Sequence, residues 1–348
     1  VRAVRSGLRD RSTFVRQVTQ DRYRYTPGNR LLTALRGKDV LLVFVESYGK
    51  VAVQGSSFAP GVDRVLDRGT HDLAAAGFAA RSGWLTSPTF GGISWLAHST
   101  LQSGLWVDSP GRYDELIASD RFTLSQAFRR AGWRAVDDVP ADDRLWPQGL
   151  AFYHYDRIYN RNDVGYQGPK YAYAPMPDQY VLLGLERLER AKAPRRPLFA
   201  EVDLVSSHTP WTQIPRLVGW DEVGDGSIFH ALPLAQAPRS SLWGDPAQVK
   251  EAYGRSIEYS LSALVSYVRR YGSEDTVLVV LGDHQPATIV TGNGASHDVP
   301  ITVLARDPAV LDRIAGWGWD DGLRPGADAP VWPMSAFRDR FLAAFSSR

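Results

Sequence analysis

Asp39-Val-Leu-Leu-Val-Phe-Val-Glu46 is a continuous apolar run that ends in a carboxylate, and it decides the fold class. Continuous rather than alternating apolarity is typical of a central strand that is buried on both faces of an α/β sheet. Similar runs recur at 197–205, 276–281 and 299–305. Each run is far shorter than the roughly 20 apolar residues of a membrane-spanning helix, so no segment is expected to span a membrane.

Helix-like patterns separate and follow these runs. Strands that alternate with helices predict an α/β fold with a central, mostly parallel or mixed sheet sandwiched by helices. The stretch 224–246 is rich in Gly, Pro and Ser and predicts a long loop. The helical patterns lie at 62–75, 94–103, 123–131, 177–191, 247–271, 308–315 and 335–345.

The charge of the chain is nearly balanced but unevenly distributed. The 348 residues are 44% hydrophobic and include 40 Lys and Arg against 38 Asp and Glu. Residues 1–38 carry ten of the basic residues against Asp10 and Asp21, which leaves residues 39–348 mildly acidic. We therefore expect a basic, juxtamembrane-like arm over 1–38 and one domain of the size of a catalytic domain over 39–348. The absence of Cys excludes thiol catalysis and Cys-ligated metals.

Polar side chains follow three of the predicted strands at the point where each strand ends. Glu46 follows the first run, His208 lies three residues after the second, and Asp283 and His284 follow the third. In open α/β sheets ligands collect at the carboxyl ends of strands, and these residue types suit a divalent metal. Taken singly, each is more often a helix-capping or loop-bonding residue. Their joint placement favours a metal site.

A fourth element is the stretch 87–104, in which Pro88 and a Gly-Gly pair mark a tight loop before a helix. Thr89 precedes this helix, and Ser94 is expected to cap it. A hydroxyl just before a helix N-terminus is suited to holding an oxyanion or phosphate. Alone, the element would be read as a set of capping and turn residues.

These four elements, in this order, resemble the alkaline phosphatase superfamily, in particular the branch that contains lipoteichoic acid synthase and the phosphoethanolamine transferases. The similarity covers residues 39–305 and includes a final His297 in a Ser-His-Asp-Val-Pro stretch. It implies an alkaline-phosphatase-like fold and one divalent metal ion, Mn or Zn, with Thr89 as the nucleophile. The metal ligands that it implies are Glu46, Thr89, Asp283 and His284.

Departures from the family pattern limit what can be transferred. The Cys/Ser-x-Pro-x-Arg motif of classical sulfatases is missing from the sequence. Two-metal members have an Asp four residues before the middle His, where this chain has Leu204; Asp203 is one residue off and is expected on the other face of its strand. A single metal is therefore expected, with His208 and His297 left to bind substrate oxygens.

Further residues are expected at the substrate. Lipoteichoic acid synthase has a Trp-x-Arg that grips glycerol phosphate, and the comparable stretch here is Trp146-Pro-Gln148. Gln148 replaces the Arg of that motif, and Arg144 and Arg157 are the candidates to substitute for it. Trp211 follows His208 by three residues and is expected in the pocket.

The resemblance implies a metal-dependent phosphotransferase or phosphodiesterase that acts through a phosphothreonine on a lipid-linked or cell-envelope phosphodiester, such as glycerol phosphate. A soluble phosphatase or phosphonate-type hydrolase is the alternative enzyme, and an inactive module that binds envelope polymers is the alternative of another class. The expected location is the extracellular face of a cell membrane, with transmembrane anchors outside this chain and residues 1–38 on anionic lipid. Nucleic acid is not an expected partner, because few aromatics accompany the Arg residues of the arm.

Overall fold

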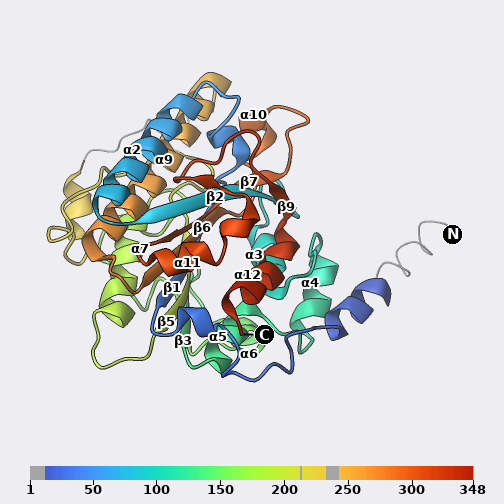
Figure 1. Cartoon of the computed structure of the whole chain (residues 1–348). Helices are drawn as coiled ribbons and strands as arrows, with labels where there is room; N and C mark the ends of the chain where they lie inside the picture. Colours follow the sequence, from blue (N-terminus) through green and yellow to red (C-terminus); the bar gives the residue numbers. More distant parts are fainter. Residues whose placement is uncertain (1–11, 212–213, 233–242, 348) are drawn as a thin grey trace.

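The computed structural model describes residues 12–211, 214–232 and 243–347, and in this part of the chain the strands form one mixed sheet (Figure 1). Strands β4, β3, β5, β1 and β6 lie side by side in this order and run parallel. Strands β7 and β2 come next and are each antiparallel to their neighbours in that order. The expected mixed, mostly parallel sheet is confirmed. The order is β4 (Arg157–Tyr159), β3 (Arg134–Asp138), β5 (Leu198–Leu204), β1 (Asp39–Val45), β6 (Thr276–Gly282), β7 (Asp298–Ala305), β2 (Ala79–Thr86) and β8 (Asp320–Asp321), with β9 (Val331–Pro333) also paired to β2.

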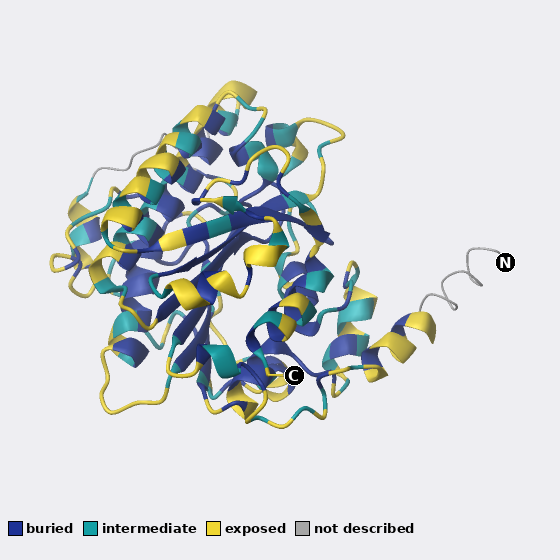
Figure 2. Cartoon of the chain, viewed as in Figure 1, coloured by how far each residue is buried: buried dark blue, intermediate teal, exposed yellow. Residues whose placement is uncertain are grey.

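Strand β1 lies at the centre and supplies side chains to two separate apolar cores. All seven of its residues are buried. Leu41 and Val43 belong to the core on one face, whereas Leu42 and Phe44 belong to the core on the other, because successive side chains of a strand point to opposite faces. Figure 2 shows the buried strands between helices whose outer sides are exposed.

Helices cover both faces of the sheet. The first core is closed by α2 (Ala59–Ala75), α7 (Asp178–Leu185) and α9 (Pro246–Tyr271), and the second by α3 (Ser94–Ser103), α5 (Leu124–Arg130) and α12 (Phe337–Phe345). Over the described ranges, no helix is both long and apolar enough to cross a membrane. Further α-helices are α4 (Pro110–Ile117), α6 (Pro147–Tyr153), α10 (Thr288–Thr291) and α11 (Pro308–Asp312).

Strand β2 was not expected, because Arg81, Ser82 and Gly83 interrupt its apolar pattern. It is nevertheless an inner strand of the sheet, between β7 and β8. The buried Ser82 hydroxyl is satisfied by the Thr302 hydroxyl and by the carbonyl oxygen of Gly322. A polar residue is tolerated there because it has hydrogen-bond partners.

The segment 12–38 packs into the second core. Residues 12–19 are helical, and Phe14, Leu31 and Leu35 are at most 1% exposed within that core. The expected boundary between residues 38 and 39 therefore does not coincide with the edge of the core. Residues 1–11 of the expected arm and residues 233–242 of the expected loop lie outside the described residues.

Candidate active site and metal centre

Three neighbouring parallel strands bring the polar residues at their ends to one edge of the sheet. β5, β1 and β6 lie side by side, and Glu46 and Asp283 come directly after β1 and β6. Gly282 allows this close approach, because a Cβ there would lie 1.8 Å from the carbonyl oxygen of Tyr48. The glycine of the Gly-Asp-His stretch is thus required by the backbone that follows Glu46.

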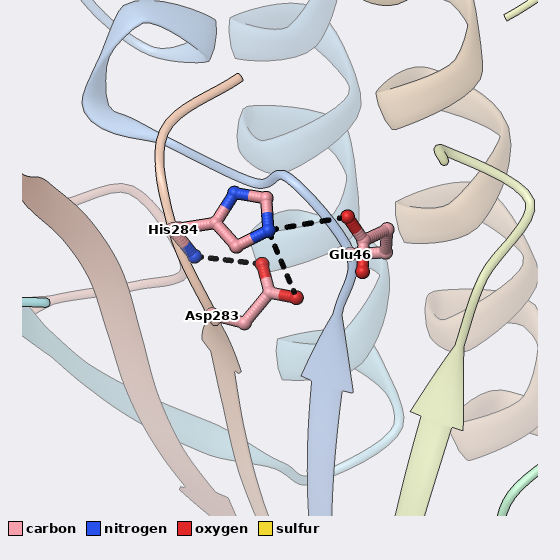
Figure 3. A group of neighbouring side chains, drawn as sticks. All are labelled: Glu46, Asp283 and His284. Atoms are coloured by element: carbon pink, nitrogen blue, oxygen red, sulfur yellow. Dashed lines mark hydrogen bonds and ion pairs between the residues drawn. The ribbon is translucent and has the colours of Figure 1, made fainter. Parts of the chain in front are cut away.

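Glu46, Asp283 and His284 converge on one point (Figure 3). The Nε2 atom of His284 lies 3.3 Å from Oε1 of Glu46 and 3.8 Å from Oδ2 of Asp283. One ligand atom from each residue falls within 4.8 Å of the others, and all three residues are buried. We call these three residues the Glu46 cluster.

Hydrogen bonds hold His284 and Asp283 so that one ligand atom of each faces the cluster. The Nδ1 atom of His284 lies 2.8 Å from the carbonyl oxygen of Gln285, which accepts a hydrogen bond only, so Nδ1 carries a proton and Nε2 is the nitrogen that faces the cluster. Oδ1 of Asp283 accepts hydrogen bonds from the backbone N–H groups of Ser47 and His284, at 2.8 and 2.7 Å, which leaves Oδ2 for a ligand. The donor set of two carboxylates and one imidazole fits a divalent ion such as Mn or Zn.

The electrostatics of the cluster favour positive charge. Burial raises the pKa of Glu46, but the His284 imidazole outweighs it and holds this pKa well below its usual range. Burial and the Glu46 carboxylate raise the pKa of Asp283. Burial lowers the pKa of His284, but Asp283 and Glu46 more than offset it and raise the pKa to about 10. A divalent cation satisfies this demand for positive charge as well as a proton does.

Ser94 is the hydroxyl that lies against the Glu46 cluster. It is the first residue of α3, and its Oγ donates a hydrogen bond to Oε2 of Glu46 at 2.8 Å and lies 3.2 Å from Nε2 of His284. The preceding loop turns sharply, with φ of 72° at Gly91 and 65° at Ile93. A β-branched residue is rarely found in this left-handed region, and such strain is typical of functional sites.

Thr89, the expected nucleophile, has a different partner. It is buried, and its Oγ1 donates to the carbonyl oxygen of Gly92 at 2.5 Å. Within the described ranges, no hydrogen bond joins Thr89 to the Glu46 cluster. The structure therefore brings Ser94 to the three expected ligands and leaves Thr89 in the loop. The Gly-Gly pair in front of Ser94 was the available sequence signal, because it permits a turn that points the next hydroxyl at the sheet edge.

A cavity of about 460 Å³ opens beside the cluster. Glu46, Ser94 and Asp283 line it, and so do the expected substrate residues His208 and Trp146. The His208 ring stacks on Tyr173, with centroids 3.5 Å apart, and its Nδ1 lies 2.6 Å from the carbonyl oxygen of Thr209. His208 is therefore held in place at the wall of the cavity.

Other expected residues do not line this cavity. Trp211 is 2% exposed, and its indole N–H donates to the carbonyl oxygen of Ser207. His297 is exposed, with Nδ1 3.2 Å from the carbonyl oxygen of Ser87. Gln148 and Arg144 are exposed as well.

A second group of titratable residues lines the same cavity and was missed in the sequence. His98 on α3 faces Glu201 and Asp203 on β5. Asp203 lies on the face of β5 opposite to Leu204, as expected, and its side chain lines the cavity. Burial lowers the pKa of His98, whereas Asp203 and Glu201 raise it to about 9. Burial, together with Glu201 and Asp203, raises the pKa of Asp137 on the neighbouring strand β3.

No protein-family model and no curated protein matches the sequence. Solved structures do match. The chain is similar to the lipoteichoic acid synthase LtaP from Listeria monocytogenes, with a TM-score of 0.58 and 13% identity over 91% of this chain and 74% of that one. It is also similar to the C-terminal periplasmic domain of EcEptC from Escherichia coli in complex with Zn, with a TM-score of 0.55 and 11% identity over 89% and 82% of the two chains.

A third similar structure is a protein in the alkaline phosphatase superfamily from Vibrio parahaemolyticus, with a TM-score of 0.53 and 16% identity. The match covers 79% of this chain and 62% of that one, so this chain spans less than two thirds of that protein's length. Because these three structures are only 11–16% identical to this chain, their similarity to it shows a shared fold. The expected alkaline-phosphatase-like architecture is thereby confirmed, and the chain has the α/β fold found in the alkaline phosphatase superfamily.

Proposed function

We propose that this chain catalyses metal-dependent phosphoryl transfer or phosphodiester hydrolysis on a lipid-linked or cell-envelope phosphodiester, with Ser94 as the nucleophile. The observation that carries the proposal is the Ser94 hydroxyl, which lies against both Glu46 and His284 at the N-terminus of a helix. A nucleophile, metal-type ligands and a cavity then occur at one place. The similarity of the fold to that of LtaP, which is a lipoteichoic acid synthase, supports this chemistry.

Glu46, Asp283 and His284 would hold the metal ion, and the Ser94 hydroxyl lies where it would complete a set of four ligands. A divalent ion there would draw electron density from a phosphoryl oxygen and favour the ionised form of the serine. Zn is a reasonable candidate, since the similar EcEptC domain was solved in complex with it.

Two displacements complete the reaction. In the first, the bond between Ser94 Oγ and phosphorus forms while the bond from phosphorus to the leaving alcohol breaks, which leaves the phosphoryl group with its remaining ester on Ser94. His208 lines the cavity and would protonate the leaving oxygen. In the second, an acceptor alcohol or water attacks phosphorus, its proton returns to His208, and Ser94 leaves in its ionised form.

The substrate is proposed to be a large envelope molecule, and the location to be the outer side of a cell membrane. Exposed Arg16, Arg22 and Arg30 put positive charge on the segment 12–38, which would favour anionic lipid. Part of the basic charge is already neutralised within the protein, since Arg24 pairs with Asp120 and Lys38 with Asp307.

The test compares alanine variants of three hydroxyl residues in the Zn- or Mn-loaded protein. With bis(4-nitrophenyl) phosphate as substrate, Ser94→Ala should lower kcat by at least ~10³-fold, because the attacking atom is removed. Ser99→Ala is the matched control on the same helix; its hydroxyl donates to the carbonyl oxygen of Leu96, away from the site, and turnover should be unchanged. Thr89→Ala tests the nucleophile that the sequence pattern indicates.

The outcomes separate the alternatives. Loss of turnover in Thr89→Ala with full turnover in Ser94→Ala would refute the assignment of Ser94. Preference for 4-nitrophenyl phosphate over the diester would favour a soluble phosphatase, and metal binding without any turnover would favour a binding module. A 4-nitrophenyl phosphoryl adduct should appear by mass spectrometry on the tryptic peptide 82–112, which contains both hydroxyls, so fragmentation must place it on residue 94.

A further inference from the structure

His98, Glu201 and Asp203 form a second group of potential metal ligands, which we call the His98 cluster. The Nδ1 atom of His98 lies 3.4 Å from Oε1 of Glu201 and 3.5 Å from Oδ1 of Asp203. One ligand atom from each residue falls within 4.8 Å of the others. Glu201 and Asp203 are alternate residues of β5 and share a face, and Asp137 on β3 lies beside Glu201 in the sheet.

The negative charge of this cluster is not balanced by protein cations. Three carboxylates, those of Asp137, Glu201 and Asp203, face one imidazole, and no Lys or Arg stands among the described residues that line the cavity. A proton on His98 would offset only one of these charges. Buried charges that lack partners are costly, so a site of this kind favours a bound cation.

Two buried groups point to a missing ligand. The Asp137 residue is 4% exposed and lines the cavity, and within the described part of the chain its carboxylate makes no hydrogen bond or ion pair. The Oδ1 atom of Asp203 is buried and has no hydrogen-bond partner there either. Buried polar atoms nearly always have partners in folded proteins, so these atoms mark a place where a ligand is expected.

Neighbouring side chains fix the orientation of the potential ligands. The His98 ring stacks on Phe44, with centroids 3.8 Å apart and an interplanar angle of 14°. Oε2 of Glu201 accepts hydrogen bonds from the amide of Gln102 and the hydroxyl of Tyr155, which leaves Oε1 facing His98. Such outer contacts are typical of ligands that are held ready for a metal.

We propose that His98, Glu201 and Asp203 bind a second divalent metal ion, assisted by Asp137, in the cavity that Ser94, Glu46 and Asp283 also line. One imidazole with carboxylates suits Mn or Zn. The ion would face the substrate space and take a phosphate or hydroxyl oxygen of the substrate as a further ligand. The single ion expected from the sequence rested on Leu204, which stands where two-metal members have an Asp. The His98 cluster instead uses Glu201 and Asp203, which precede Leu204 on the same strand.

The experiment counts metal ions in the full chain. The protein is stripped with EDTA, titrated with MnCl₂ or ZnSO₄ by calorimetry, desalted and measured by inductively coupled plasma mass spectrometry. We expect two ions in the wild type, and one in Asp203→Asn and in Asp283→Asn. Asp142→Asn is the matched control, because Asp142 lines the same cavity outside both clusters and loses the same charge; it should keep two ions.

Equal metal content in the wild type and in folded Asp203→Asn would overturn the proposal, and so would loss of both ions in that variant. Circular dichroism checks folding, and His98→Gln replaces Asp203→Asn if that variant does not fold. This proposal does not depend on turnover. Two bound ions without activity would contradict the proposed function but support the second metal site. One bound ion with full activity would support the proposed function but contradict the second metal site.

Discussion

Asp21→Asn should destabilise the protein strongly, although Asp21 belongs to the segment that the sequence marks as an arm. Its carboxylate is 1% exposed and lies 2.7 Å from Nη1 of Arg338 and 3.1 Å from Nε of Arg121. Both arginine side chains are also buried, at 0% and 4% exposed. The substitution therefore leaves two guanidinium groups buried beside a neutral amide.

The expected cost follows from the partners that remain. Removing one partner of a buried ion pair costs about 3–5 kcal/mol. Arg338 keeps Asp339 at 2.6 Å and the carbonyl oxygen of Phe122, and Arg121 keeps the carbonyl oxygen of Ser103 at 2.9 Å. Because these contacts remain, we expect the loss of unfolding free energy to lie at the lower end of that range, at about 3 kcal/mol. At roughly 2 °C per kcal/mol for a protein of this size, Tm should fall by about 6 °C.

Urea unfolding followed by circular dichroism measures the change, with Asp120→Asn as the control. Asp120 pairs with Arg24 from the same segment, but its side chain is 73% exposed, so its loss should cost at most about 1 kcal/mol. If the two variants unfold at the same urea concentration, the segment 12–38 is not part of the cooperative domain and the reasoning fails. A lowered m-value would show that two-state behaviour is lost and would call for local measurements.

Two further predictions concern the backbone at the site. Gly282→Ala should lower metal affinity at least ~10-fold, because its Cβ would collide with the carbonyl oxygen of Tyr48 and displace the chain after Glu46; unchanged metal titrations would contradict this. Ile93→Gly should leave the unfolding free energy unchanged or raise it by up to about 1 kcal/mol, because glycine adopts the φ of 65° without strain. Turnover of the glycine variant should fall, since the loop before Ser94 becomes more flexible. The control Ile93→Val should unfold at the same urea concentration as the wild type. A lower unfolding free energy of Ile93→Gly would show that residue 93 is not strained.

The sheet and the Glu46 cluster could be predicted because they depend on strong, short-range patterns. The run 39–46 is apolar throughout, as a strand between two covered faces must be. The ends of β1 and β6 then bring Glu46 and Asp283 together without further information, since parallel neighbours end at the same edge. Strand β2 escaped prediction because its polar residues find partners only in the folded sheet.

The nucleophile and the second cluster depend on geometry that the sequence pattern does not specify. Thr89 and Ser94 are five residues apart, and left-handed φ values at Gly91 and Ile93 decide which hydroxyl faces the cluster. The orientation of Asp203 depends on the register of β5 against β1, which pairs it with Phe44. A shift of one residue would have turned it away from the cavity.

The two ends of the described chain are joined by hydrogen bonds, which has a consequence for biosynthesis. Leu32 donates its N–H to the Ser346 hydroxyl, and the N–H of Ser347 donates to the carbonyl oxygen of Arg30. The first of these pairs is separated by 314 residues. At about 5–20 residues per second of translation, the apolar side chains near Leu32 wait on the order of 15–60 s for α12 to be made. We therefore expect this part of the second core to close only after α12 has been synthesised, because α12 supplies apolar side chains to it.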